Sequence, residues 1–189
     1  MYYLMASFLP SIWIGKGFSL KQAGQLAMLF QFMSPIAIIL LTILMNHANH
    51  RKINLVRIIA VSSSLLISIG SAGMTFMDFD GYSFGQMLFW AGLWTLLLGF
   101  GASMVFTLCL MLITMRTHDT KQAGDLSAMS QTIAYMIAII GPLGVGWLHE
   151  QSGSWYLPLI ILTALMSFNV IFAWTASKAV MIDGEKIPC

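Results

Sequence analysis

The residues of this chain that could do chemistry form a polar stripe in otherwise apolar sequence. Ser127, Gln131 and Tyr135 recur every four residues, so on a helix they share one face. Their hydroxyl and amide groups donate and accept hydrogen bonds, which suits contact with a small solute. They equally suit hydrogen bonds between neighbouring helices. Both interpretations predict that the stripe faces protein or water, because unpaired polar groups are costly in hydrocarbon.

Two tryptophans form a second candidate contact for a solute. Trp90 and Trp94 are four residues apart and therefore share a helix face, where their rings could stack on a flat or aromatic molecule. The alternative is an aromatic belt at the membrane surface, since both residues lie early in their apolar stretch.

The histidines give little support for metal or acid–base chemistry. His47 and His50 form an H-x-x-H pattern but lack the further Cys or carboxylate ligands of a metal site. His149 and Glu150 are adjacent, with no nucleophile near them, and are expected to cap and solvate a helix end. We therefore predict no catalytic residues, no metal and no cofactor.

The composition predicts that the solvent of this chain is lipid. Of its 189 residues, 58% are hydrophobic and 8% are charged, whereas a soluble domain carries roughly 25% charged residues. The formal net charge of +2 is too small and too dispersed to suggest binding to nucleic acid. Cys109 and Cys189 predict no disulfide framework, and Cys109 reads as a small apolar packing residue.

Five apolar stretches are long enough to cross a hydrocarbon core of about 30 Å. A sixth, 2–14, would reach only about 20 Å at the helical rise per residue. We expect it to be a transmembrane helix whose beginning is missing, which makes the chain the back part of a longer protein. The predicted fold is all-α, with spans at 2–14, 24–45, 53–77, 84–115, 125–148 and 155–176.

The positive charges predict the orientation of these spans. The connectors alternate across the membrane, and seven basic residues fall on one side against Lys16 and Lys21 on the other. By the positive-inside rule the richer side is cytoplasmic, which also places the tail 177–189 in the cytoplasm. The seven residues are Arg51, Lys52, Arg57, Arg116, Lys121, Lys178 and Lys186.

A repeated phrase indicates internal symmetry. Residues 121–131 read KQAGDLSAMSQ and residues 21–31 read KQAGQLAMLFQ, so Gln31 matches Gln131. Three spans separate the two copies, and their helices must therefore run in opposite directions. This arrangement is typical of an inverted repeat of three plus three helices, as found within each half of a major facilitator transporter.

Each copy of the phrase also begins with a helix-capping pattern. Ser19 precedes Gln22, and Asp119 precedes Gln122, in the spacing of a capping box. The alternative to an inverted repeat is a shared preference for this kind of helix start, together with prolines that are ordinary in membrane helices.

Prolines and glycines mark the candidate moving parts. Pro35 and Pro142 interrupt the two spans that follow the repeated phrases, and a proline permits a kink where a cavity or neighbour compensates. Gly141 adjoins Pro142, and Gly99 and Gly101 narrow the span 84–115. The first explanation of these small residues is close packing between helices. The alternative, which is more specific to transport, is a hinge that opens a cavity.

The second repeat resembles a known transporter family. Residues 124–155 and the stretch FLPSIWIGKGFSLKQAG are similar to the eleventh helix, and to the end of the seventh helix with its following loop, of cyanate permease-like major facilitator transporters. That branch also includes 2-nitroimidazole transporter-like proteins. The residues that carry the resemblance are Gly124, Leu126, Ser127, Met129, Gln131, Tyr135, Ala138, Gly141, Pro142, Gly146, His149, Gly153, Ser154 and Trp155.

The resemblance implies the C-terminal half of a twelve-helix permease, helices seven to twelve, with a missing N-terminal half as partner. Ala134 stands where a glycine is expected, and Glu150 where aspartate is usual. The connector NHANHRK is a poor version of the superfamily's basic loop motif. Substrate identity is not carried by any of these residues.

We therefore expect a secondary transporter of a small solute or anion in the bacterial inner membrane, working by alternating access. Gln31, Trp90 and Trp94 join the polar stripe as candidate substrate contacts. Arg116 and Asp125, at facing cytoplasmic ends, are a candidate latch, although exposed charges can contribute almost nothing. The rival interpretation is a self-standing six-helix assembly or interaction protein that acts as a homodimer.

Overall fold

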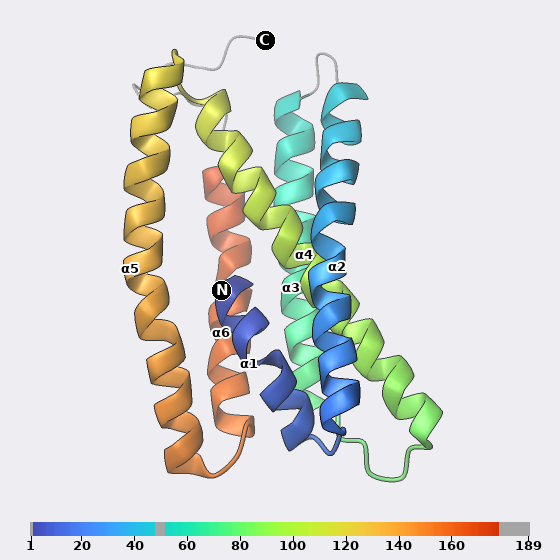
Figure 1. Ribbon diagram of the computed structural model, residues 1–189. Helices are drawn as coiled ribbons and strands as arrows, with labels where there is room; N and C mark the ends of the chain where they lie inside the picture. The colour runs from blue at the N-terminus through green and yellow to red at the C-terminus, as the bar shows by residue number, and fades with distance from the viewer. Residues whose placement is uncertain (1, 48–51, 178–189) are drawn as a thin grey trace.

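Six helices run in alternating directions in the computed structural model, which describes residues 2–47 and 52–177 (Figure 1). No strand occurs in these two ranges. The six-helix, all-α prediction is confirmed. The bounds are α1 Tyr2–Gly15, α2 Leu20–His47, α3 Lys52–Phe76, α4 Phe84–Met115, α5 Thr120–Ser152 and α6 Tyr156–Ala176.

Within the described part of the chain, five helices, α2 to α6, are long and apolar enough to cross a membrane. α1 has 14 residues and begins halfway up the bundle (Figure 1). The predictions that concern His50, Arg51, Lys178, Lys186 and Cys189 fall outside the described residues, as does the predicted cytoplasmic tail beyond Ser177.

The predicted capping patterns are confirmed and explain why α2 and α5 begin before their apolar stretches. The Ser19 amide donates to Gln22 Oε1 at 2.9 Å, and the Gln22 amide donates back to Ser19 Oγ at 3.4 Å. Asp119 Oδ1 accepts from the Gln122 amide at 2.6 Å. The repeated KQAG therefore forms the first turn of each helix rather than a connector.

Pro35 and Pro142 do not end their helices. α2 continues through Pro35, and α5 continues through Pro142. The expectation that these prolines interrupt the two spans is therefore wrong, because the helix continues on both sides of each proline.

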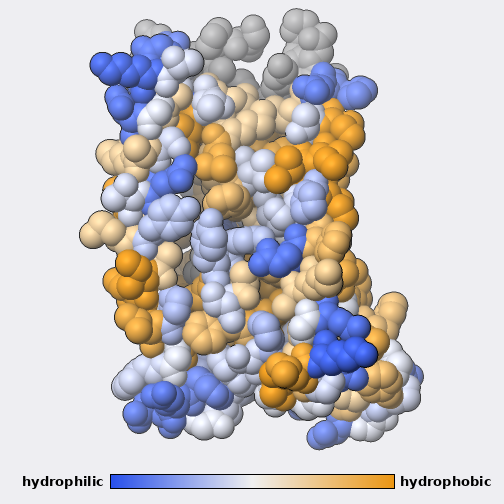
Figure 2. Space-filling view, viewed as in Figure 1, coloured by the Kyte–Doolittle hydropathy of each residue, from blue (hydrophilic) through white to orange (hydrophobic). Residues whose placement is uncertain are grey.

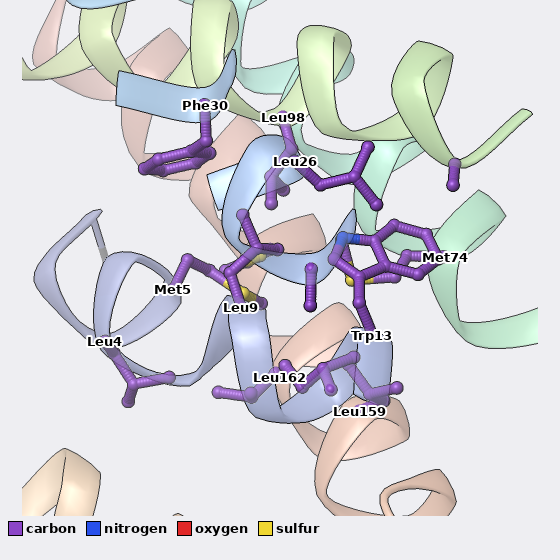
Figure 3. Packing of buried hydrophobic residues seen from close by; sticks show 14 of the residues in the cluster. Leu4, Met5, Leu9, Trp13, Leu26, Phe30, Met74, Leu98, Leu159 and Leu162 are labelled. Atoms are coloured by element: carbon purple, nitrogen blue, oxygen red, sulfur yellow. The ribbon is translucent and has the colours of Figure 1, made fainter. Parts of the chain in front are cut away.

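The main core surrounds α1. Figure 3 shows Met5, Leu9 and Trp13 of α1 inside a shell of side chains from α2, α3, α4 and α6. A second cluster lies nearer the other end, between α2, α3 and α4. The shell in Figure 3 includes Leu26, Phe30, Met74, Leu98, Leu159 and Leu162.

Two glycines of α4, which have no side chain, let this helix pack closely against α2 and α3. A Cβ on Gly99 would lie 2.9 Å from the Phe30 carbonyl oxygen of α2. A Cβ on Gly101 would lie 2.7 Å from the Ser63 carbonyl oxygen of α3. The close-packing interpretation of these two glycines is confirmed.

α5 is the least buried helix, with Val145 its only buried residue among those described. It stands at the edge of the bundle, apart from α2 and α3 (Figure 1). A Cβ on Gly144 or Gly146 would meet nothing within 4 Å, so close packing does not explain these glycines in the described chain.

Candidate functional site

Aromatic rings from four helices meet about midway along the bundle. Tyr2 packs against Phe30 and Phe106, with ring centroids 5.3 and 6.0 Å apart. Tyr3 packs against Phe106 and Tyr135 at 6.3 and 5.9 Å. We call these five residues the aromatic cluster. It joins α1, α2, α4 and α5, which are distant in sequence.

Polar groups border the aromatic cluster. Tyr2 Oη donates to Gln31 Oε1 at 2.7 Å, and the Tyr3 and Tyr135 hydroxyls lie 3.4 Å apart. Gln31, Tyr3 and Tyr135 are exposed. The site therefore presents ring edges and faces together with hydroxyl and amide groups that can form further hydrogen bonds.

The polar stripe of α5 continues from this cluster. Gln131 Nε2 donates to Ser127 Oγ at 2.9 Å, and Tyr135 follows one turn later. Gln131 and Tyr135 are exposed and Ser127 is half-buried. Figure 2 shows a hydrophilic band through the middle of this face, between more hydrophobic edges. Within the described chain, Ser127 and Gln131 therefore bond to each other and not to another helix, whereas Tyr135 reaches Tyr3 of α1.

A mainly apolar cavity of about 440 Å³ adjoins the cluster between α1, α5 and α6. Tyr3 lies on its wall, and Gly141 and Gly144 line its α5 side. Pro142 is half-buried beside them. This places the candidate hinge next to the cavity, but the hinge itself stays a prediction.

The tryptophan pair lies elsewhere. Trp90 and Trp94 stack on each other with centroids 5.7 Å apart. Trp94 Nε1 donates to Met77 Sδ at 3.1 Å, and its ring covers Gly73 of α3. This packing on α3 does not bring the pair to the aromatic cluster, so their contact with a solute stays a prediction.

The two members of the candidate latch have different surroundings. Arg116, at the end of α4, donates from Nη2 to the Ala176 carbonyl oxygen at the end of α6. Asp125 is exposed in the second turn of α5, on the wall of a shallow surface pocket. A latch between them stays a prediction.

The connectors α1–α2, α3–α4 and α5–α6 meet at the other end of the bundle around a cavity of about 480 Å³. Lys16 lies there half-buried and donates to the Met77 carbonyl oxygen at 3.1 Å. Burial lowers the pKa of the Lys16 ammonium, and Asp78 acts in the opposite direction. Lys16 thereby ties α1 to the end of α3.

His149 stands at this same end, as expected. Its ring stacks on Trp155 with centroids 4.0 Å apart, and its carbonyl oxygen accepts from the Gly153 amide at 2.9 Å. Across residues 2–47 and 52–177, no group of three or more His, Cys, Asp or Glu side chains is placed to hold a metal ion.

Sequence reasoning missed Tyr2, Tyr3, Phe30 and Phe106. They lie in apolar stretches where aromatic residues are common, and no spacing marks them. The available signal was that the resembled family lines its cavity with the seventh and tenth helices, which correspond to α1 and α4.

The chain is similar to bacterial transporters. It is 31% identical over 178 residues, 94% of the chain, to the 2-nitroimidazole transporter of Escherichia coli, covering 42% of that protein. It is 29% identical to the uncharacterized transporter YycB of Bacillus subtilis, over 88% of the chain and 38% of that protein. It is 24% identical to the cyanate transport protein CynX of Escherichia coli, over 91% of the chain and 42% of that protein.

The chain thus spans about two fifths of the length of these curated relatives. No family model matches it. No solved structure matches it either. The relatives and the five membrane-length helices of the described chain make it a multi-pass membrane protein. Its six helices and its relatives together show that the chain belongs to the major facilitator superfamily, in the branch of 2-nitroimidazole transporter-like and cyanate permease-like proteins.

Proposed function

We propose that this chain is the C-terminal half of a secondary transporter that moves a small organic solute or anion across the bacterial inner membrane by alternating access. The aromatic cluster carries this proposal. Side chains from four helices meet there midway along helices that are long enough to span a membrane. Major facilitator transporters bind substrate near the membrane midplane while two halves rock around it.

The proposed binding face combines rings with uncharged hydrogen-bonding groups. Gln31 and Gln131 occupy matching positions of the two repeats, and Tyr135 joins the α5 stripe to the aromatic cluster. Rings favour a planar solute through stacking, and the amides and hydroxyls fix its orientation. One relative is named as a transporter of 2-nitroimidazole, which is a planar heterocycle, and this name supports the preference for a planar solute.

The remaining parts of the proposal follow from this role. The missing N-terminal half would supply the opposite wall of the cavity, and any ionisable group that couples transport or binds an anion at the midplane. The chain itself would act as a transporter and not as an enzyme. The positive-inside rule supports a cytoplasmic position for the ends of α2, α4 and α6.

The test uses the complete in-phase reading frame that includes this chain, expressed in bacteria that lack related transporters. Radiolabelled planar aromatic solutes and cyanate are offered to the cells, and uptake and efflux are measured. Gln31→Ala and Tyr135→Phe are each expected to raise KM about threefold to tenfold, the value of one lost hydrogen bond.

Matched controls come from the same helices. Gln25→Ala and Thr132→Val remove exposed polar groups of α2 and α5, and Thr132 bonds only to the Ala128 carbonyl oxygen of its own helix. Both are expected to leave KM unchanged. Transport of no small solute by the complete protein, or equal effects in controls and cluster variants, would contradict the proposal.

A further inference from the structure

The apolar cavity between α1, α5 and α6, of about 440 Å³, owes its space to small residues on its α5 wall. Helix α5 packs closely on α1 at Gly141, where a Cβ would lie 2.8 Å from Leu4 Cδ1. One turn further along, a Cβ on Gly144 would meet nothing within 4 Å. Ala134 and Ala138 continue the same wall. The contact at Gly141 therefore sets the spacing of the two helices, and its small neighbours leave room for a ligand.

The part of a ligand that this cavity accepts is apolar and uncharged. Among the described residues that line it, Tyr3 alone has a polar side chain, and none carries a charge. Leu4, Val145 and Leu162 on its walls are buried. An alkyl group that enters gains close packing against these side chains and gives up no hydrogen bond, so the cavity suits an apolar substituent.

A pair of hydroxyls adjoins the cavity at Tyr3. The Tyr3 and Tyr135 hydroxyl oxygens lie 3.4 Å apart, well beyond the usual spacing of about 2.7–2.8 Å for such a bond. Each hydroxyl donates one hydrogen bond and accepts others, so the pair retains capacity for a further polar group. Tyr3 also belongs to the aromatic cluster. It therefore joins an apolar compartment to an aromatic, hydrogen-bonding one.

The depth of the hydroxyl pair favours a small molecule over a phospholipid. Tyr3 lies in the first turn of α1, which begins halfway up the bundle (Figure 1). The phosphate of a phospholipid stays at the membrane surface, so an acyl chain in the cavity brings no polar group to the hydroxyls. A small solute with a polar group next to an apolar one satisfies both compartments.

We propose that the transported solute is an amphipathic aromatic molecule, such as a phenol with an alkyl substituent. Its polar group bonds to the Tyr3 and Tyr135 hydroxyls, its ring packs against the aromatic cluster, and its substituent fills the cavity between α1, α5 and α6. This inference rests on the proposed function, because it assigns the substrate class of the same site.

The first experiment locates the substituent without relying on transport. The protein of the complete reading frame is reconstituted in lipid nanodiscs and irradiated with a phenol whose para-alkyl chain carries a diazirine. Mass spectrometry is expected to find the label in peptides from 134–148 and 161–165, which hold the α5 and α6 walls of the cavity. An excess of 4-butylphenol is expected to abolish the label, because it occupies the same cavity.

Gly144→Leu is expected to lower this labelling at least about fivefold, because the leucine side chain takes up the space of the substituent. Gly146→Leu is the matched control. A Cβ on Gly146 also meets nothing within 4 Å, but Gly146 does not line the cavity. It is expected to leave the labelling unchanged. Labelling confined to other helices, or an equal loss in both variants, would overturn the proposal.

The second experiment measures how the substituent affects affinity. Phenols with hydrogen, methyl, ethyl, propyl or butyl at the para position compete with uptake of a radiolabelled planar solute by the wild type. The inhibition constant is expected to fall about threefold to fourfold for each added methylene, the value of burying that group. Gly144→Leu is expected to flatten this series and Gly146→Leu to keep it, whereas simple partition into the membrane gives the same series in both.

The outcomes separate the substrate class from the transport role. Uptake of the planar solute with equal inhibition by all five phenols would overturn the proposal while leaving the transport role intact. Absence of any uptake would contradict the transport role, and the photolabelling would still decide whether the cavity binds the phenol. A phospholipid with a diazirine in its acyl chain is the last arm. If it labels 134–148 and 161–165 and 4-butylphenol does not reduce that label, lipid fills the cavity and the proposal fails.

Discussion

Gly101 shows how a single missing side chain fixes the distance between two helices. Its Cα faces the α3 backbone so closely that a Cβ would lie 2.7 Å from the Ser63 carbonyl oxygen and 3.0 Å from the Ile67 amide nitrogen. Backbone atoms cannot swing aside as a flexible side chain can. Any residue larger than glycine must therefore push α3 and α4 apart.

Gly101→Ala is accordingly expected to destabilise the protein by about 1–3 kcal/mol, the usual cost of overpacking a filled interior. Thermal unfolding of the purified chain in detergent measures this. Gly124→Ala is the control, because a Cβ there meets nothing within 4 Å and alanine is the better helix former. An equal loss of stability in both variants would contradict this account.

Between α3 and α6, polar side chains form a buried row of hydrogen bonds, which we call the seam. The Thr75 and Thr163 hydroxyls lie 2.8 Å apart, and Ser68 Oγ donates to the Met166 carbonyl oxygen at 3.3 Å. Hydrogen bonds between transmembrane helices are modest in energy because the unfolded helices also find partners in the membrane. Their value here is to fix the register of two otherwise apolar helices.

Thr163→Val is expected to cost about 0.6–1.7 kcal/mol, the range found for such bonds. Thr175→Val, in the same helix, is the control, because Thr175 is exposed and bonds only to carbonyl oxygens of its own helix. Unfolding in denaturant measures the free energy of unfolding of both variants. Adding Thr75→Val and the double variant Thr75→Val and Thr163→Val completes a double-mutant cycle for the bond between the two hydroxyls. If Thr175→Val lowers the free energy of unfolding as much as Thr163→Val does, the loss in Thr163→Val does not come from the bonds of the seam.

Pro142 tests whether α5 bends during transport. The helix is continuous through it, yet a proline leaves one carbonyl without its intrahelical donor and weakens the helix locally. In the protein of the complete reading frame, Pro142→Ala is expected to shift the accessibility of a cysteine at position 131 toward one membrane side. Maleimide labelling from each side measures this.

Pro158→Ala is the matched control, since Pro158 lies in the first turn of α6, where no intrahelical donor is lost. It is expected to leave labelling unchanged. If Pro142→Ala also leaves it unchanged, α5 does not bend at this proline.

The elements were easier to predict from sequence than the site. Long apolar stretches and the caps at Ser19 and Asp119 indicate where helices begin, because lipid requires each backbone group to bond within its helix. The face that a helix turns inward is harder to predict, because apolar residues suit contact with lipid as well as contact with protein. α4, for example, is apolar all round. For this reason the polar stripe at Gln131 was found, whereas Tyr3 and Phe106 were not.

At the scale of the whole molecule, the two repeats have different partners. α2, of the first repeat, packs its buried residues against α4 and the α1 core, whereas α5, its counterpart, buries only Val145 within the described chain. Apolar residues lie exposed along α5, among them Met136, Ile140 and Leu143 at 65%, 68% and 70%. Lipid can cover one side of such a helix, while the other side carries the polar stripe and faces the proposed second half.

This difference predicts how the chain behaves when it is made alone. Backbone amides of α5 are expected to exchange with deuterium much faster than those of α4, because α4 is packed between α2 and α3 and α5 lacks such support. In the protein of the complete reading frame, the protection of α5 is expected to rise toward that of α4. Mass spectrometry of peptides from 130–145 and 90–105 measures both. Cells that make the chain alone are expected to show no uptake, because the cavity lacks its opposite wall. Strong protection of α5 in a purified homodimer of this chain, together with uptake, would instead favour a self-standing six-helix protein.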